Sequence, residues 1–265
     1  MAKQLHFVSG LPRACSTLLM QLLAQNPRVH STPTSALHEI GYIARQVFQT
    51  EEAKATDMQN VLEPMYLDYV KAGCENAFNS LTDRPVVVDK CRSWVGHLDQ
   101  LFKIWPDAKV IVPVRDVRAI LSSFEKKRRQ HPEVFNGIEK ANPANWTTIE
   151  KRVNGWLSSP PIGIAIERLH EALRFKDRLH FVHAEDLTTD PQGTMLKVWD
   201  YLGEESVIHD AKNVQQYTQE HDVGFPYGDH VIRPEVKPLV PDWHDTLGRN
   251  LSEQINQKFN WIQEL

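Results

Sequence analysis

The chain has 265 residues and a formal net charge of -4, with 41% hydrophobic and 24% charged residues. This composition is typical of a globular protein with a full core and excludes a disordered chain, and the negative charge gives no reason to expect a nucleic-acid partner. No stretch approaches the roughly 20 apolar residues that a membrane-spanning helix needs, so no membrane span is expected. The cysteines have no metal-ligand spacing, and no signal-peptide pattern precedes the first expected strand, so we expect a cytoplasmic protein.

The first expected elements are a strand, a tight loop and a helix. An apolar strand ends near Val8, and a helix with an apolar face is expected over residues 18–25. The connecting loop feeds a helix N-terminus, where unpaired backbone N–H groups and the helix dipole favour an anion. Arg13 adds a fixed positive charge, and Ser16 and Thr17 add hydroxyl donors. The loop therefore predicts a phosphate site.

This loop differs from the ATP-binding loop G-x-x-x-x-G-K-[ST]. Counted from Gly10, the second glycine position holds Cys15 and the lysine position holds Ser16, so the lysine that reaches the β- and γ-phosphates is missing. The dinucleotide fingerprint G-x-G-x-x-G is also absent. The phosphatase pattern C-x5-R would need an arginine where Gln21 stands, so we interpret Cys15 as a small loop residue and not as a nucleophile.

Helix and strand patterns then alternate along the chain. Buried strands are expected over residues 29–31, 85–89, 109–114 and 180–183. Helical patterns cover residues 37–78, 94–105, 117–130, 146–175 with a break at 160–161, and 191–202, while 136–145 resembles a loop and the part after 203 a surface excursion. Continuous apolar strands that alternate with helices predict the α/β class, with a parallel sheet covered by helices on both faces. Because no linker or repeat is evident, we expect a single domain over residues 1–265.

Three of the expected strands end close to cations. Arg13 follows the first strand, Lys90 ends the strand after Pro85, and Arg115 follows the strand over 109–114. Ligands of parallel α/β sheets bind beyond the carboxyl ends of the strands. Cations that meet at one edge of a mildly acidic protein predict a nucleotide with several phosphate or sulfate groups.

These strand ends carry motifs of a known family. Gly-Leu-Pro-Arg-Ala-Cys-Ser-Thr-Leu-Leu resembles the 5′-phosphosulfate loop of the sulfotransferases that use 3′-phosphoadenosine 5′-phosphosulfate (PAPS). Val-Pro-Val-Arg-Asp-Val-Arg-Ala-Ile-Leu-Ser-Ser resembles their 3′-phosphate motif, in which a serine follows the strand-end arginine by eight residues, as Ser123 follows Arg115. The stretch from Val182 to Pro191 is similar to their Tyr-Glu-Asp-Leu segment. The resemblance covers positions 5 to about 203 and is closest to the branch with protein-tyrosine and heparan-type enzymes and their bacterial relatives.

The resemblance implies a P-loop-NTPase-like sulfotransferase fold and in-line transfer of the sulfuryl group of PAPS to a hydroxyl acceptor, with no metal. It also implies site roles. The 5′-phosphosulfate would be bound by Arg13, Ser16, Thr17 and the backbone N–H groups of Ala14 and Cys15. The 3′-phosphate would be bound by Arg115 and Ser123. Lys90 resembles the family's strand-end lysine and, with Arg13, would stabilise charge on the transferred group.

The acceptor hydroxyl needs a base to take its proton. Members of this branch use a glutamate after the first helix and strand, for which Glu39 is the candidate, while His38 beside it has the better unperturbed pKa. In the cytosolic small-molecule branch, a histidine follows the strand-end lysine by two residues, and Arg92 at that position argues against that branch. A peptide tyrosine, a sugar hydroxyl and a small alcohol all remain open as acceptors, and the sequence does not reveal the oligomeric state.

Two other functions remain open on the sequence. One is a P-loop small-molecule or nucleotide kinase, against which Ser16 in the lysine position argues. The other is a non-catalytic PAPS-binding relative. The family's loop glycine is replaced by Cys15 and the tyrosine of Tyr-Glu-Asp-Leu by Ala184, so cofactor contacts differ at both positions.

Overall fold

The computed structural model describes residues 3–56, 60–133, 139–140, 143–220 and 230–265. Within these ranges, five parallel strands form one sheet in the order β2-β3-β1-β4-β5. The strands are β1 (Gln4–Val8), β2 (Val29–Thr34), β3 (Val86–Lys90), β4 (Val110–Val114) and β5 (Leu179–His183). The predicted α/β class with a parallel sheet is confirmed.

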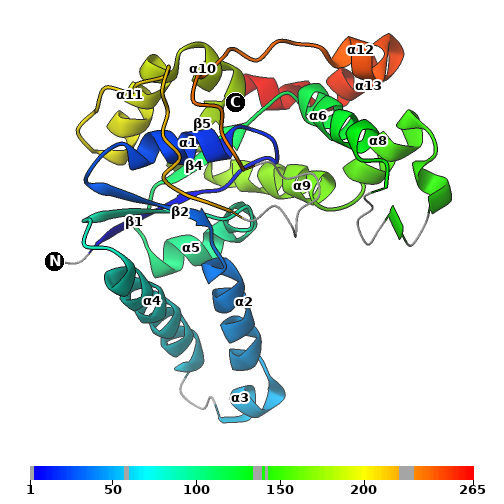
Figure 1. Ribbon diagram of the computed structural model, residues 1–265. Coiled ribbons are helices and arrows are strands. Elements are labelled where there is room, and N and C mark those ends of the chain that lie inside the picture. The colour runs from blue at the N-terminus through cyan, green and yellow to red at the C-terminus, as the bar shows by residue number, and fades with distance from the viewer. Residues whose placement is uncertain (1–2, 57–59, 134–138, 141–142, 221–229) are drawn as a thin grey trace.

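Helices connect the strands and cover the sheet (Figure 1). The α-helices are α1 (Ser16–Ala24), α2 (Leu37–Phe48), α3 (Glu51–Thr56), α4 (Leu62–Leu81), α5 (Leu98–Ile104), α6 (Val117–Gln130), α8 (Ile149–Leu157), α9 (Ile162–Ala172), α10 (Ala184–Thr189), α11 (Pro191–Leu202), α12 (Trp243–Leu247) and α13 (Arg249–Phe259). Short 3₁₀ helices are η1 (Trp94–His97), η2 (Pro143–Trp146), η3 (Leu173–Arg178) and η5 (Asn260–Glu264). No helix in the described part of the chain is both long and apolar enough to span a bilayer.

Neighbouring residues of each strand point to opposite faces of the sheet, and both faces are covered by helices. Val87 packs on one face in a core cluster with α4, α5, α6, α8, α9 and α13. Val86 and Val88 pack on the other face, against α1 and α11. This two-sided burial explains why the strands appear in the sequence as continuous apolar runs.

Most predicted boundaries agree with the structure, and one expectation in this part of the chain needs correction. The helices over 117–130 and 191–202 match α6 and α11, and the predicted break at 160–161 separates α8 from α9. The helical patterns predicted over 37–78 correspond to α2, α3 and α4, with residues 57–59 outside the described part. The predicted loop over 136–145 lies partly outside the described residues, and its last residues belong to η2.

The expectation that the part after residue 203 is a surface excursion is wrong for its C-terminal end. The described residues between Gly203 and Asp242 contain no helix or strand, as expected, but α12, α13 and η5 follow. Ile255, Phe259 and Ile262 recur at helical spacing and are buried in the core. The prolines and glycines that suggested a surface excursion belong to the stretch before α12, and the helical pattern behind them was overlooked.

Gly10 marks a close approach between the loop after β1 and the end of β4. A Cβ atom at this position would lie 2.2 Å from the carbonyl oxygen of Pro113, which already accepts a hydrogen bond from the Leu11 N–H at 2.9 Å. The neighbour is backbone and has little room to move. Gly10→Ala is therefore expected to lower the free energy of unfolding by about 1–3 kcal/mol, as overpacking does elsewhere, measured by denaturant titration.

Gly73→Ala is the matched control, because a Cβ atom at Gly73 in α4 would meet no atom within 4 Å. Alanine is favoured over glycine in a helix interior by about 1 kcal/mol, so this variant is expected to be as stable as the wild type or more so. Equal stability of the two variants would contradict a close approach at Gly10.

Candidate active site

The loop between β1 and α1 lies at the carboxyl edge of the sheet and has an unusual backbone. Arg13 and Cys15 have φ angles of 60° and 57°, in the left-handed region that side chains disfavour. Cys15 is the N-cap of α1, but its side chain makes no capping hydrogen bond, and the first turn of the helix contains no acidic residue. The backbone N–H groups and the positive dipole end of α1 thus receive no capping side chain or carboxylate from this turn, which suits an external anion.

Three of the predicted phosphate-binding residues are brought together where β1 and β4 run side by side. Arg13 Nε donates to Ser123 Oγ at 3.1 Å, and an Arg115 guanidinium N–H donates to the carbonyl oxygen of Arg13 at 2.8 Å. Groups about 100 residues apart in the chain therefore form one cluster, which places the arginine of the predicted 5′ loop against the serine of the predicted 3′ motif.

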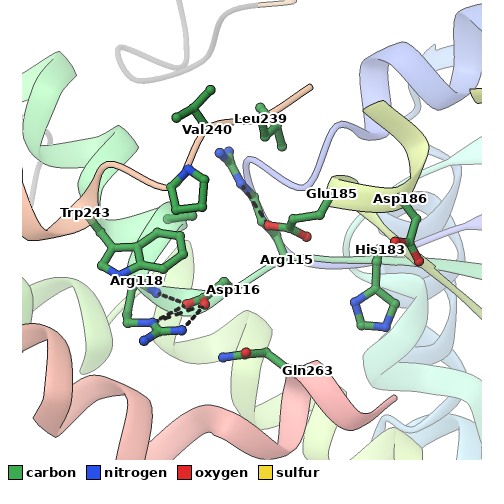
Figure 2. Close-up of a pocket in the computed structure, with 12 residues that line it drawn as sticks. Arg115, Asp116, Arg118, His183, Glu185, Asp186, Leu239, Val240, Trp243 and Gln263 are labelled. Carbon is green, nitrogen blue, oxygen red and sulfur yellow. Dashed lines mark hydrogen bonds and ion pairs between the residues drawn. The ribbon is translucent and has the colours of Figure 1, made fainter. Parts of the chain in front are cut away.

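One N–H group of the Arg115 guanidinium makes no hydrogen bond to any described residue. Its Nε is buried and makes no hydrogen bond within the part of the chain that the structure describes. The carboxylate of Glu185 lies 3.8 Å away, an ion-pair contact without a hydrogen bond (Figure 2). A buried charged donor without an acceptor is unfavourable, and an anionic ligand oxygen would satisfy it.

A cavity of about 380 Å³ opens beside Arg115. It lies at the carboxyl ends of β4 and β5, and the chain from Leu239 to Trp243 forms another of its walls (Figure 2). The guanidinium of Arg118 lies 4.5 Å from the centre of a Trp243 ring and forms a bidentate ion pair with Asp116. The volume is in the range of small-molecule sites, so the cavity next to the arginine cluster can hold part of a ligand.

Lys90 is the second cationic centre of this edge. It ends β3, where it is in register with Val8 of β1 on one side and Thr34 of β2 on the other. It therefore lies beside the start of the loop that contains Arg13. Its side chain is only 7% exposed, and its Nζ donates to the carboxylate of Glu220, which is 8% exposed.

Burial and the opposite charge of the partner act on the pKa values of both Lys90 and Glu220. Burial lowers the pKa of Lys90, and Glu220 opposes this shift. Burial alone would raise the pKa of Glu220, but hydrogen bonds from Lys90 and Thr34 and the charges of Lys90 and His230 outweigh it and hold the pKa below its ordinary value. Glu220 is therefore ionised at neutral pH, in direct contact with the lysine.

The two candidate bases from the sequence, His38 and Glu39, are brought together at the start of α2. His38 Nε2 lies 2.9 Å from His97 Nδ1, and His38 Nδ1 lies 3.3 Å from Glu39 Oε1. Burial, followed by the charge of His97, lowers the pKa of His38 to about 4. The Glu39 side chain is 59% exposed and accepts a hydrogen bond from Ser93 at 3.4 Å. The carboxylate that contacts Lys90 belongs to Glu220 instead.

Asp89 fixes the geometry around Lys90. Its carboxylate is fully buried and accepts hydrogen bonds from Trp94 Nε1 at 2.7 Å and Thr32 Oγ1 at 3.3 Å. Thr32 Oγ1 in turn accepts the backbone N–H of Lys90 at 2.9 Å. One carboxylate thus joins β2, β3 and η1, so that the lysine leaves the sheet in a defined direction.

Sequence reasoning did not identify Glu220 or His230. The two residues flank a stretch outside the described residues, and His230 Nε2 lies 3.3 Å from Glu220 Oε2. No motif or periodic pattern distinguishes this glutamate from the other acidic residues of the chain. Its burial against Lys90, which is far away in the sequence, is visible only in the fold.

Several solved structures share the fold of this chain. Among solved structures, the sulfotransferase domain of the Synechococcus PCC 7002 olefin synthase has a TM-score of 0.52 and 20% identity, with 97% of this chain and 95% of that chain covered. The sulfotransferase domain of the curacin biosynthetic pathway has a TM-score of 0.56 and 16% identity, with 98% of each chain covered. Sulfotransferase STF9 from Mycobacterium avium has a TM-score of 0.53 and 13% identity, with 100% of this chain and 77% of that chain covered.

These likenesses concern the fold, which is the P-loop-NTPase-like sulfotransferase fold that the resemblance predicted. The family itself comes from the sequence. The family model described as the sulfotransferase family matches residues 6–208, which include the β1–α1 loop, Lys90 and the Arg115 motif. The chain belongs to the sulfotransferase family.

Proposed function

We propose that this protein transfers the sulfuryl group of PAPS to a hydroxyl-bearing acceptor. Membership of the family supports sulfuryl transfer in general. The observation that carries the choice of donor is the Arg115 cluster. Arg115 lines a ligand-sized cavity, has a buried Nε that makes no hydrogen bond to a described residue, and contacts Arg13, which in turn bonds to Ser123. The 3′-phosphate distinguishes PAPS from ATP, and Arg115 is the group that would recognise it.

Two groups of residues would bind the two ends of the nucleotide. Arg13, Ser16 and Thr17, with the backbone N–H groups of Ala14 and Cys15, would bind the 5′ end of the nucleotide. Arg115 and Ser123 would bind the 3′-phosphate. When bound, PAPS supplies an activated sulfuryl group on a phosphate leaving group.

Arg13 and Lys90 would provide the catalytic charge. Sulfuryl transfer resembles phosphoryl transfer, in which positioning and electrostatic stabilisation supply most of the rate. Lys90 is buried and held in place by its position at the end of β3, so its charge needs little reorganisation during the reaction. Because a sulfuryl group has less charge than a phosphoryl group, we expect these side chains to suffice without Mg²⁺.

Calorimetric titration without Mg²⁺ tests the donor. The wild-type protein is expected to bind 3′-phosphoadenosine 5′-phosphate (PAP) with micromolar affinity and ATP far more weakly. Arg115→Ala removes charge-assisted hydrogen bonds worth about 1.5–3 kcal/mol, so we expect PAP binding to weaken about 10- to 100-fold.

Arg174→Ala is the control variant, since Arg174 is 63% exposed and pairs with Asp99 on the surface. It is expected to bind PAP like the wild type. Tight ATP binding that requires Mg²⁺, or no PAP binding at all, would favour the kinase and contradict the proposal. PAP binding without any turnover of PAPS would favour the non-catalytic relative.

A further inference from the structure

Glu220, whose carboxylate contacts Lys90, belongs to a part of the chain outside the sheet. We name this part the α1 strap and define it as residues 214–220 together with 230–236. Its two halves are joined by a backbone hydrogen bond from Val214 to Pro234 at 2.7 Å, and Val236 donates to Ala211, just before the strap, at 2.8 Å. Figure 1 shows this part of the chain crossing α1, the helix that follows the phosphate loop. The strap thus leads from the outer helices to the carboxyl edge of the sheet.

A buried glutamine of α1 anchors the strap. Gln21 is fully buried, and its Nε2 donates to Thr218 Oγ1 at 2.6 Å. Its Oε1 accepts the backbone N–H groups of Tyr217 at 2.6 Å and Thr218 at 3.1 Å. All these contacts fall within four residues of Glu220, so the position of the glutamate is set by the same helix that begins at the phosphate loop.

A second glutamine joins the two halves of the strap near the site. Gln216 Nε2 donates to the carbonyl oxygens of Thr218 at 3.0 Å and His230 at 2.8 Å, and its Oε1 accepts the Ile232 N–H at 3.1 Å. His230 is thereby held beside Glu220. Such an arrangement holds a functional group in place before any ligand binds.

From this geometry we infer that Glu220 is the general base of the reaction, positioned by His230 and Thr34 to take the proton of the acceptor hydroxyl. The inference rests on the proposed function. In the transfer step, the acceptor oxygen forms a bond to sulfur while its proton passes to the Glu220 carboxylate, which becomes a carboxylic acid. The bond between sulfur and the 5′-phosphate oxygen breaks, and that oxygen keeps the electron pair, so that PAP leaves.

The charges around Glu220 suit this role. The charged or titratable groups that face it are Lys90 on β3, Arg92 just after β3, and His230 on the strap. In the free protein these groups keep the carboxylate ionised and therefore ready to accept a proton. When an anionic ligand neutralises Lys90, the pKa of Glu220 rises, which makes the carboxylate a stronger base at the stage when it is needed.

The candidates at the start of α2 are less suited. Glu39 contacts Ser93 and His38 and not Lys90. His38 has its pKa lowered to about 4 by burial, so it is a weak base at neutral pH. Of these three groups, Glu220 is the one that contacts the predicted catalytic lysine.

Glu220→Gln tests the inference, because the amide keeps the size of the side chain and an oxygen for Lys90 but cannot take the proton. Turnover is measured as release of PAP from PAPS with water as the acceptor, and PAP affinity is measured by calorimetry. We expect the rate to fall by about 10²- to 10⁴-fold, the usual contribution of a general base. We expect PAP affinity to stay the same or to increase, and the loss of rate toward acid pH that protonation of Glu220 causes in the wild type to disappear.

Two variants give the comparison. Glu235→Gln removes an exposed carboxylate of the same strap, which pairs with Lys237, and is expected to turn over like the wild type. Glu39→Gln tests the competing base. A rate loss in Glu39→Gln with a normal rate in Glu220→Gln overturns the inference, and so does a rate loss in Glu220→Gln that comes with lost PAP affinity, since this would indicate a structural role.

The outcomes also separate the inference from the proposed function. A wild-type protein that binds no PAP, or that releases none from PAPS above the uncatalysed rate, overturns the proposed function and with it the role of Glu220. A wild-type protein that binds PAP and turns over, with a Glu220→Gln variant that is equally fast, overturns the inference alone.

Discussion

Replacing Lys90 with alanine is expected to slow the release of PAP from PAPS by about 10²- to 10³-fold, the size of effect seen when one preorganised charge-stabilising group is removed. The ammonium group is buried at the end of β3, beside the loop between β1 and α1. Its charge is therefore weakly screened and is present before any charge develops on the transferred group. PAP affinity, which we propose to depend mainly on the Arg115 cluster, is expected to change much less. Steady-state kinetics together with calorimetry measure both effects.

Controls separate the lost charge from lost structure. Lys103→Ala removes a lysine that is 56% exposed and is expected to leave the rate unchanged. Lys90→Ala also leaves Glu220 buried without its cation, which by itself destabilises a protein. The double variant Lys90→Ala/Glu220→Gln removes this unpaired charge and is expected to regain stability in a thermal melt but not activity. A Lys90→Ala variant with the wild-type rate would show that the lysine has no catalytic role.

The sheet and the strand–loop–helix unit at the N-terminus were predictable because their signals are local. Each buried strand is a continuous apolar run, and β1, the turn and the start of α1 occupy fewer than 25 consecutive residues. The spacing of Arg115 and Ser123 is likewise confined to one strand end and the helix that follows it. Such features depend little on the rest of the fold, so sequence alone is enough to place them.

The groups that surround Lys90 were not predictable, because they come from distant parts of the chain. Glu220 is 130 residues from Lys90 and lies in the α1 strap, which has no helical or strand period. Its burial depends on Gln21, whose polar side chain appears in the sequence as an ordinary position of an amphipathic helix. Glu39 is closer to Lys90 in the sequence than Glu220 is, but in the fold its carboxylate contacts Ser93.

The C-terminal helices illustrate a different limit. The prolines and glycines of the preceding stretch are strong signals of irregular structure. The expectation of irregular structure that they raise holds up to Asp242 but not for the residues that follow. The period of Ile255, Phe259 and Ile262 was present in the sequence and predicts an amphipathic helix, as α13 and η5 confirm. Local composition therefore misleads where a periodic segment follows it.

The helix that presents Ser123 is held in place by a buried ion cluster around Glu125. The Glu125 side chain has no exposed surface and accepts hydrogen bonds from Arg152 at 2.7 and 2.8 Å and from Arg129 at 2.7 Å. Arg152 also donates to the carbonyl oxygen of Trp146 at 3.0 Å. Through this cluster, α6 is joined to η2 and α8, so that one carboxylate supports the helix that carries Ser123.

Glu125→Ala is expected to lower the free energy of unfolding by about 3–5 kcal/mol, since it leaves the partly buried guanidinium of Arg152 without its carboxylate.

Burial alone raises the pKa of Glu125, but the hydrogen bonds and charges of Arg152 and Arg129 together lower it. The contribution of the ionised carboxylate is therefore fully present above its unfolded-state pKa and is lost as the pH falls through the lower folded-state value. Denaturant titrations at neutral and acid pH should show a gap between the wild type and the variant that narrows in acid. Glu63→Ala, at a carboxylate that is 64% exposed and paired with Lys103 on the surface, is expected to leave the free energy of unfolding essentially unchanged at either pH. A Glu125→Ala variant as stable as Glu63→Ala would show that packing alone positions α6 and the serine that it presents.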